Sequence, residues 1–231
     1  MAINTAMPKK IIIIGDSWGI GSYRYIGNPP KAIEPIDDTG IDFFLKSKGF
    51  EVTNYACSGT SNIEQLINLS SVLETQVADL IIWFHSEVTR DLIHQPIQCS
   101  SYKEMSDCAF KRNFDLAEQI YTANRIPFIV VGCLSSIPDM IKDYSFTHTV
   151  IPSWLDELTD MRYNLPISLH CNNLTKLLET TKPTDLKFVT DEIQKMMFLE
   201  TKLERYRGFS DGVHPDKNSF QALADRISCL L

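Results

Sequence analysis

Short apolar segments alternate with longer amphipathic segments between residues 9 and 151. The first apolar segment, residues 9–15, carries four consecutive isoleucines before its terminal glycine. A β-branched run that is apolar on both faces predicts a central strand of a parallel sheet. Further strands are expected at residues 51–56, 79–84 and 127–132, with a weaker fifth strand at residues 147–151.

The segments between these strands have the spacing of amphipathic helices. Helices are predicted at residues 41–48, 62–76 and 105–124, and a polar loop is expected around Pro29 and Pro30. This β-α-β alternation predicts a doubly wound parallel sheet of about five strands, with helices on both of its faces.

The last third of the chain has a different pattern. Residues 153–208 are mixed in charge and indicate a mainly helical insertion, whose clearest helix is predicted at residues 185–206. A closing helix is expected at residues 216–231. The whole chain, residues 1–231, is therefore predicted to form a single α/β domain with one insertion.

Composition and charge narrow the classes of function. With 231 residues, of which 44% are hydrophobic, the chain can bury a sizeable core. The formal net charge of -7 gives no broad attraction for phosphate backbones or anionic membranes. Neither a nucleic acid nor a membrane is therefore an expected partner.

The N-terminus and the cysteines indicate a cytoplasmic setting. The first ten residues are too polar for a signal peptide, and no stretch reaches the roughly 20 apolar residues of a membrane span. The six cysteines include no C-x-x-C pair and are expected to be mostly reduced, half-buried thiols.

The first candidate for chemistry is the turn Gly15-Asp16-Ser17-Trp18-Gly19, which directly follows the first strand. In an open parallel sheet, ligands bind outside the carboxyl ends of the strands. The glycines permit a tight turn that would expose the Ser17 hydroxyl and direct its backbone N–H at a bound anion. Two other interpretations compete: Asp16 and Ser17 only cap the next helix, or the glycines form a dinucleotide-binding turn.

The dinucleotide interpretation lacks two features. An acidic residue should close the second strand to hold a ribose, whereas this chain has Asn54 there. A short-chain dehydrogenase also needs a Tyr-x-x-x-Lys pair, which is not found at Tyr102, Tyr121, Tyr144 or Tyr163. Dinucleotide binding is therefore not expected.

The second candidate is the pair Asp211 and His214. The aspartate lies three residues before the histidine, on a glycine-bent loop that Pro215 ends. This spacing lets the carboxylate accept one ring N–H while the other ring nitrogen faces outward, which is the base that a serine hydroxyl needs. The alternative makes His214 a surface residue at a helix start, with Asp216 as the cap. The joint occurrence with Ser17 favours the catalytic interpretation.

The chain resembles the SGNH or GDSL hydrolases, a family of esterases and lipases with a flavodoxin-like sheet. The resemblance rests on three blocks spread from end to end, IIIIGDSWG, NYACSGTSN and DGVHPD. In that family the serine attacks an ester carbonyl, the histidine carries the proton, and the oxyanion binds the serine N–H, a glycine N–H and an asparagine. The resemblance implies catalytic Ser17, Asp211 and His214, oxyanion donors Ser17 and Gly59, a three-layer α/β/α fold and no cofactor.

The family's third block departs from the expected pattern here. The family usually has Gly-x-Asn-Asp after the third strand, whereas this chain has His85, Ser86 and Glu87 and no asparagine. An ionised Glu87 at the asparagine position would repel an oxyanion, and losing one donor costs about 100- to 1,000-fold in a studied protease. The open alternatives are that Ser86 or His85 donates, that Asn62 reaches in, or that Glu87 is structural. We favour pairing of Glu87 with Arg90.

The remaining candidates have mainly structural interpretations. Trp18 either shapes a substrate pocket or packs, Asp16 is expected beside the site, and Cys57 is expected to be a buried small hydrophobe. No metal is predicted, because metal-ligand spacing is missing from the other histidines, His94, His148 and His170.

The main prediction is therefore a serine esterase that acts through an acyl-Ser17 intermediate, which water resolves with His214 as base. Its partner is a small-molecule or glycan ester, such as an acetylated sugar, and the oligomeric state stays open. The rival prediction is a non-catalytic SGNH-fold protein that binds a glycan or another protein. The first two blocks are also similar to SGNH-like proteins of tailed phages, which implies a role in the virion or the host cytoplasm.

Overall fold

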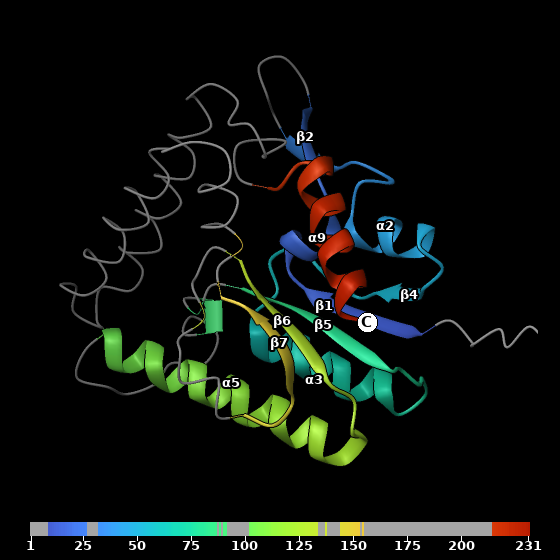
Figure 1. Cartoon of the computed structure of the whole chain (residues 1–231). Coiled ribbons are helices and arrows are strands. Elements are labelled where there is room, and N and C mark those ends of the chain that lie inside the picture. Colours follow the sequence, from blue (N-terminus) through green and yellow to red (C-terminus); the bar gives the residue numbers. More distant parts are fainter. Residues whose placement is uncertain are drawn as a thin grey trace, which may run out of the picture.

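A five-stranded parallel sheet forms the centre of the molecule, with the strand order β4-β1-β5-β6-β7 (Figure 1). The computed structural model describes residues 9–26, 32–86, 88, 90–91, 102–133, 137, 144–152, 154 and 214–231. The strands are β1 (Lys10–Gly15), β4 (Glu51–Asn54), β5 (Leu80–His85), β6 (Phe128–Gly132) and β7 (Thr147–Ile151). This order is that of the flavodoxin-like sheets, so the predicted fold class and all five predicted strands are confirmed.

Strand β1 is buried on both faces, as its four isoleucines predict. It pairs in parallel with β4 on one side and with β5 on the other. Because successive side chains of a strand point to opposite faces, Ile11 and Ile13 enter one core cluster and Ile12 and Ile14 enter the other. All four are at most 2% exposed. The strand therefore joins the two halves of the hydrophobic core.

Helices α2 (Ile41–Ser47) and α9 (Lys217–Leu230) cover one face of the sheet (Figure 1). Leu45 of α2 and Ile227 of α9 are fully buried in the same cluster as Ile11 and Ile13. Helix α9 begins where Asp216 caps it, with its carboxylate accepting the backbone N–H of Ser219 at 2.8 Å. The predicted closing helix is confirmed.

Helices α3 (Asn62–Leu73) and α5 (Tyr102–Asn124) cover the opposite face (Figure 1). Leu66 of α3 and Phe114 of α5 are buried in the cluster that holds Ile12 and Ile14. A capping box starts α3, in which Ser61 and Glu64 satisfy each other's backbone N–H groups. The two covered faces complete the three layers.

A small hairpin was not predicted. Strands β2 (Tyr23–Ile26) and β3 (Ala32–Pro35) pair antiparallel, outside the main sheet. Each strand has only four residues, and the Arg24–Glu34 ion pair links them on an exposed face. A pair this short shows no clear alternation in the sequence, so the two strands were not predicted. The loop predicted around Pro29 and Pro30 lies outside the described residues.

Three predictions about the rest of the chain are not tested by this structure. The helical insertion at residues 153–208, its helix at residues 185–206 and the single-domain assignment depend on residues that lie almost entirely outside the described part. Within the described residues, no helix combines the length and the apolar character needed to span a membrane.

The sheet topology indicates where a ligand should bind. The chain places β4 on one side of β1 and then builds β5, β6 and β7 on the other. In such sheets a crevice opens at this reversal, outside the carboxyl ends of the two strands that flank it. Here those strands are β1 and β5, whose carboxyl ends lead into the candidate residues of the first and third blocks.

Gly15 permits the close approach of these two strands. A Cβ atom at this position would lie 2.6 Å from Cβ of Phe84 on β5. We expect Gly15→Ala to lower the free energy of unfolding by about 1–3 kcal/mol, because neither strand can move without loosening the core. Urea denaturation measures this effect, with the exposed-loop variant Ser58→Ala as a control that stays within about 0.5 kcal/mol of the wild type. An unchanged Gly15→Ala midpoint would contradict the close contact.

Candidate active site

The turn after β1 caps a helix and holds Ser17 at its first position. Ser17 is only 6% exposed, so the expectation that the turn exposes its hydroxyl was wrong, because Ser17 packs into the buried start of the helix. The Asp16 carboxylate, at 1% exposure, accepts the backbone N–H of Trp18 at 3.0 Å and so acts as the N-cap of α1 (Ser17–Ile20). Ser17 is the first residue of this short helix, a position whose backbone N–H has no partner within the helix. The capping interpretation and the nucleophile interpretation are therefore compatible.

The second block is fixed directly against this turn. The backbone N–H of Cys57 donates to the carbonyl oxygen of Gly15 at 2.9 Å, and the Thr60 hydroxyl donates to the same oxygen at 3.2 Å. Between them, Gly59 has a φ of +83°, a conformation that favours glycine. Gly59 thus lies on a loop anchored to the nucleophile turn. Cys57 is exposed, so the expectation that it is buried was wrong.

His214 is held at the start of the last helix. Its ring stacks on Tyr23 of β2, with centroids 4.0 Å apart and planes 29° apart, and the residue is 6% exposed. Asp216 caps α9 as the alternative interpretation required, but the burial of His214 does not fit the surface residue of that alternative. Asp211, its predicted partner, lies outside the described residues.

An aromatic cluster connects the segment that carries Ser17 with the segment that carries His214. Trp154 packs edge-on against Trp18 with centroids 5.7 Å apart, and against Phe220 of α9 with centroids 5.1 Å apart. Trp18 is only 1% exposed, so its main role is packing. Figure 1 shows the start of α9 beside β2, which agrees with the stacking of Tyr23 on His214.

The third block is fixed by a buried polar network. The side-chain oxygen of Asn62 accepts the backbone N–H of Ser86 at 2.8 Å, and its amide nitrogen donates to the Asp91 carboxylate at 2.8 Å. Gln65 donates to the Ser86 hydroxyl at 2.9 Å and accepts from Trp83 at 2.9 Å. Asn62 and Ser86 therefore hold the loop after β5 and are fully buried, so neither reaches a surface where a substrate could bind.

Asp91 is the centre of this network. Its carboxylate also accepts the Asn113 amide at 2.8 Å and the backbone N–H of Ile63 at 3.2 Å, and so joins α3 to α5. Burial raises the pKa of Asp91, and the hydrogen bonds from Asn62 and Asn113 oppose this rise. Sequence reasoning missed this residue, because its partners are separated from it by more than 20 positions.

His85 is fully buried between aromatic rings. It stacks on Phe110 with centroids 5.0 Å apart and lies 5.0 Å from the ring of Trp83. Desolvation lowers its pKa from 6.5 to about 3, against smaller opposing backbone contributions, so the ring is neutral at pH 7. A neutral side chain enclosed by aromatic rings cannot reach an oxyanion, so His85 is a core residue.

An ion pair joins the first and third blocks. The Arg90 guanidinium lies 3.2 Å from the Asp16 carboxylate, between Nη1 and Oδ2. The sequence suggested Glu87 as the partner of Arg90, and Glu87 lies outside the described residues. The contact with Asp16 had no signal in the sequence, since it depends on the closeness of the β1 and β5 ends.

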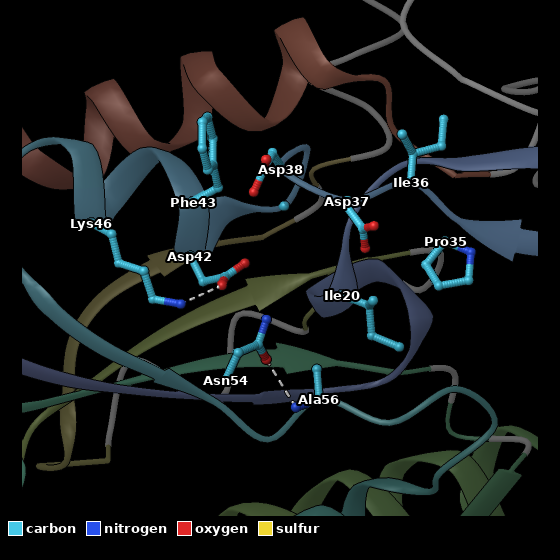
Figure 2. Close-up of a pocket in the computed structure, with 11 residues that line it drawn as sticks. Ile20, Pro35, Ile36, Asp37, Asp38, Asp42, Phe43, Lys46, Asn54 and Ala56 are labelled. Carbon is cyan, nitrogen blue, oxygen red and sulfur yellow. Dashed lines mark hydrogen bonds and ion pairs between the residues drawn. The ribbon is translucent and has the colours of Figure 1, made fainter.

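A separate pocket lies at the far end of α1 (Figure 2). It is lined by Ile20, Pro35, Ile36, Asp37, Asp38, Gly40, Asp42, Phe43, Lys46, Asn54 and Ala56. Lys46 pairs with Asp42 at 2.9 Å, which leaves a negative balance that favours neutral or cationic groups over anions. No group of histidine, cysteine, aspartate or glutamate side chains in the described part of the chain could hold a metal ion.

No protein-family model and no curated protein sequence matches the chain. Solved structures do match. Est24, a carbohydrate acetylesterase from Sinorhizobium meliloti, and TesA each align with a TM-score of 0.50 at 13% identity over 96% of this chain. The alignments cover 100% of Est24 and 98% of TesA. A GDSL-like lipase from Bacteroides thetaiotaomicron aligns with a TM-score of 0.43 at 13% identity over 97% of this chain and 90% of that one.

The chain has the SGNH hydrolase fold. The similarity to Est24 and TesA extends over nearly the full length of each chain, and the order of the five parallel strands agrees with it. At 13% identity this similarity establishes the fold only. The chemistry of an SGNH fold depends on the residues at its site.

The burial of His85 makes stability dependent on pH. Between pH 6.5 and about 3 the unfolded chain binds a proton at this histidine that the folded chain does not, so stability falls as the pH falls. When the pH falls from 7 to 5, protonation of His85 in the unfolded chain should lower the free energy of unfolding by about 2 kcal/mol. Urea denaturation of the wild type and His85→Leu at both pH values isolates the effect, because the other titrating groups are common to both. An equal loss in the two proteins would show that His85 is not the cause.

Proposed function

We propose that the protein is a serine esterase that hydrolyses a carboxylic ester, with Ser17 as nucleophile and His214 as general base. The observation that carries this proposal is the position of Ser17 at the reversal point of the sheet, together with a buried His214 held on Tyr23 at the start of α9. The similarity to Est24, a carbohydrate acetylesterase, supports the proposal. The packing of Trp154 against Trp18 and Phe220 also supports it, because it connects the segments that carry the two residues.

In the proposed reaction, His214 takes the hydroxyl proton of Ser17 while the Ser17 oxygen attacks the ester carbonyl carbon. The tetrahedral oxyanion collapses, the bond to the alcohol oxygen breaks, and His214 returns the proton to the leaving alcohol. Water then attacks the acyl-Ser17 ester with His214 again as base, which releases the acid. Asp211 is proposed to orient the imidazole through its second ring nitrogen.

Two backbone groups are proposed to stabilise the oxyanion, the N–H of Ser17 and the N–H of Gly59. The hydrogen bonds from the second block to Gly15 support this assignment, since they keep the Gly59 loop against the nucleophile turn. Backbone donors held in this way need no reorganisation during the reaction. Asn62 is not proposed as a third donor, because its amide already bonds to Asp91 and Ser86.

The proposed substrate is an ester of a small molecule or a glycan, with an acetylated sugar as one form. One structural neighbour is a carbohydrate acetylesterase, which supports this class. The alternative is a binding protein with this fold that has lost catalysis. The missing third-block asparagine is the specific observation in its favour.

Activity-based labelling separates the two functions. We expect a fluorophosphonate probe to label the wild type but not Ser17→Ala, because only an activated serine attacks the phosphorus. For p-nitrophenyl acetate, Ser17→Ala and His214→Ala should each lower kcat/KM on the order of 10⁴-fold or more. Ser47→Ala, which changes an exposed serine on α2, is the matched control and should react as the wild type does. Absence of Ser17-dependent labelling and turnover from about pH 6 to pH 9 would favour the binding protein.

A further inference from the structure

We propose that Arg90 is a positioning residue for the nucleophile, which acts through the carboxylate of Asp16. This inference rests on the proposed esterase function and adds a role for the third block. Arg90 follows β5, whereas Asp16 follows β1, and their side chains meet at 3.2 Å. The ion pair thus connects the two strands that flank the reversal point of the sheet.

Both oxygens of the Asp16 carboxylate have a defined use. One oxygen accepts the backbone N–H of Trp18 at 3.0 Å, and this contact caps the helix that begins with Ser17. The other oxygen faces Arg90. Asp16 is 1% exposed and the Arg90 side chain is 26% exposed, so removal of Arg90 leaves a buried carboxylate without its ion-pair partner. Arg90 therefore keeps a charged cap stable directly beside Ser17.

The pair also affects the charge that develops during the reaction. An oxyanion bound at the Ser17 N–H would form one residue away from the Asp16 carboxylate. In a partly desolvated site, two negative charges at that separation repel each other strongly. The Arg90 cation cancels the charge of Asp16, so that the carboxylate can cap the turn without opposing the oxyanion.

The buried network explains how Arg90 is held in place. Its neighbour Asp91 is bound by side chains from α3 and α5, and Ser86 before it is bound on both its backbone and its hydroxyl. The segment that carries Arg90 is therefore anchored on both sides. A residue that must hold a partner in position needs such support, because small displacements of reacting groups cost rate.

Steady-state kinetics on p-nitrophenyl acetate test this role. We expect Arg90→Met to lower kcat by about 100-fold with KM changed less than about twofold, because the nucleophile is misplaced while the ester site is kept. Arg90→Lys, which keeps the charge, should recover to within about 10-fold of the wild type. The double variant Asp16→Asn with Arg90→Met should have a higher kcat than Arg90→Met alone. In this double variant the side chain at position 16 can still cap the helix, but it no longer carries a charge that lacks a partner.

The control is Ile120→Ala on α5, which removes a buried apolar side chain near the end of the helix that leads into β6. It should keep kcat within about threefold of the wild type even where its unfolding midpoint falls as far as that of Arg90→Met. Wild-type kcat in Arg90→Met, an equal loss in Ile120→Ala, or no gain in the double variant would each overturn the inference. If Arg90→Met does not fold, the double variant alone tests the inference. A kcat of the double variant within about 10-fold of the wild type supports the inference, and a larger loss overturns it. A wild type without turnover overturns the proposed function and the inference together.

Discussion

Strand β1 has no face toward water, and the rest of the structure depends on this constraint. Its isoleucines alternate between two core clusters, so helices must cover both sides of the sheet, and strands must pair along both of its edges. The two pairings create the reversal in strand order. The carboxyl end of β1 therefore emerges at the reversal point of the sheet rather than at its edge, which is where ligands bind in sheets of this kind.

The buried carboxylate of Asp16 beside Ser17 lies opposite the Arg90 guanidinium, so its charge is balanced by a neighbouring side chain. The ring of His214 stacks on that of Tyr23. Ser86 and Asp91, by contrast, take part in a buried network that fixes the loop after β5. The third block lacks the asparagine that the resemblance to SGNH hydrolases implies, and the described residues of this segment supply structural support and the Arg90 cation.

The sequence predicted the helices and strands that depend on the local pattern of residues. It did not predict the contacts between residues that lie far apart along the chain. Runs such as the β1 isoleucines and the apolar stripe of α9 identify their elements, because strand and helix periods appear directly in the order of residues. The β2–β3 hairpin was missed because each strand has four residues. Ser17 and His214 were predicted from their motifs and their positions along the chain, whereas Gly59 was implied by the family resemblance. The roles of all three residues stay predictions. The inward use of Asn62 and the Arg90–Asp16 contact could not be predicted, since both depend on which loops the sheet brings together.

Helix α9 has a consequence for the order in which the molecule is made. It supplies Phe220, Leu223 and Ile227 to the cluster on one face of the sheet, and the histidine precedes it by only a few residues. During synthesis all five described strands of the main sheet leave the ribosome before this helix does. Until then the face that α2 partly covers lacks the apolar side chains of α9, and Ser17 lacks the histidine proposed as its base. Burial of that face and assembly of the proposed site therefore both wait for the same segment of the chain.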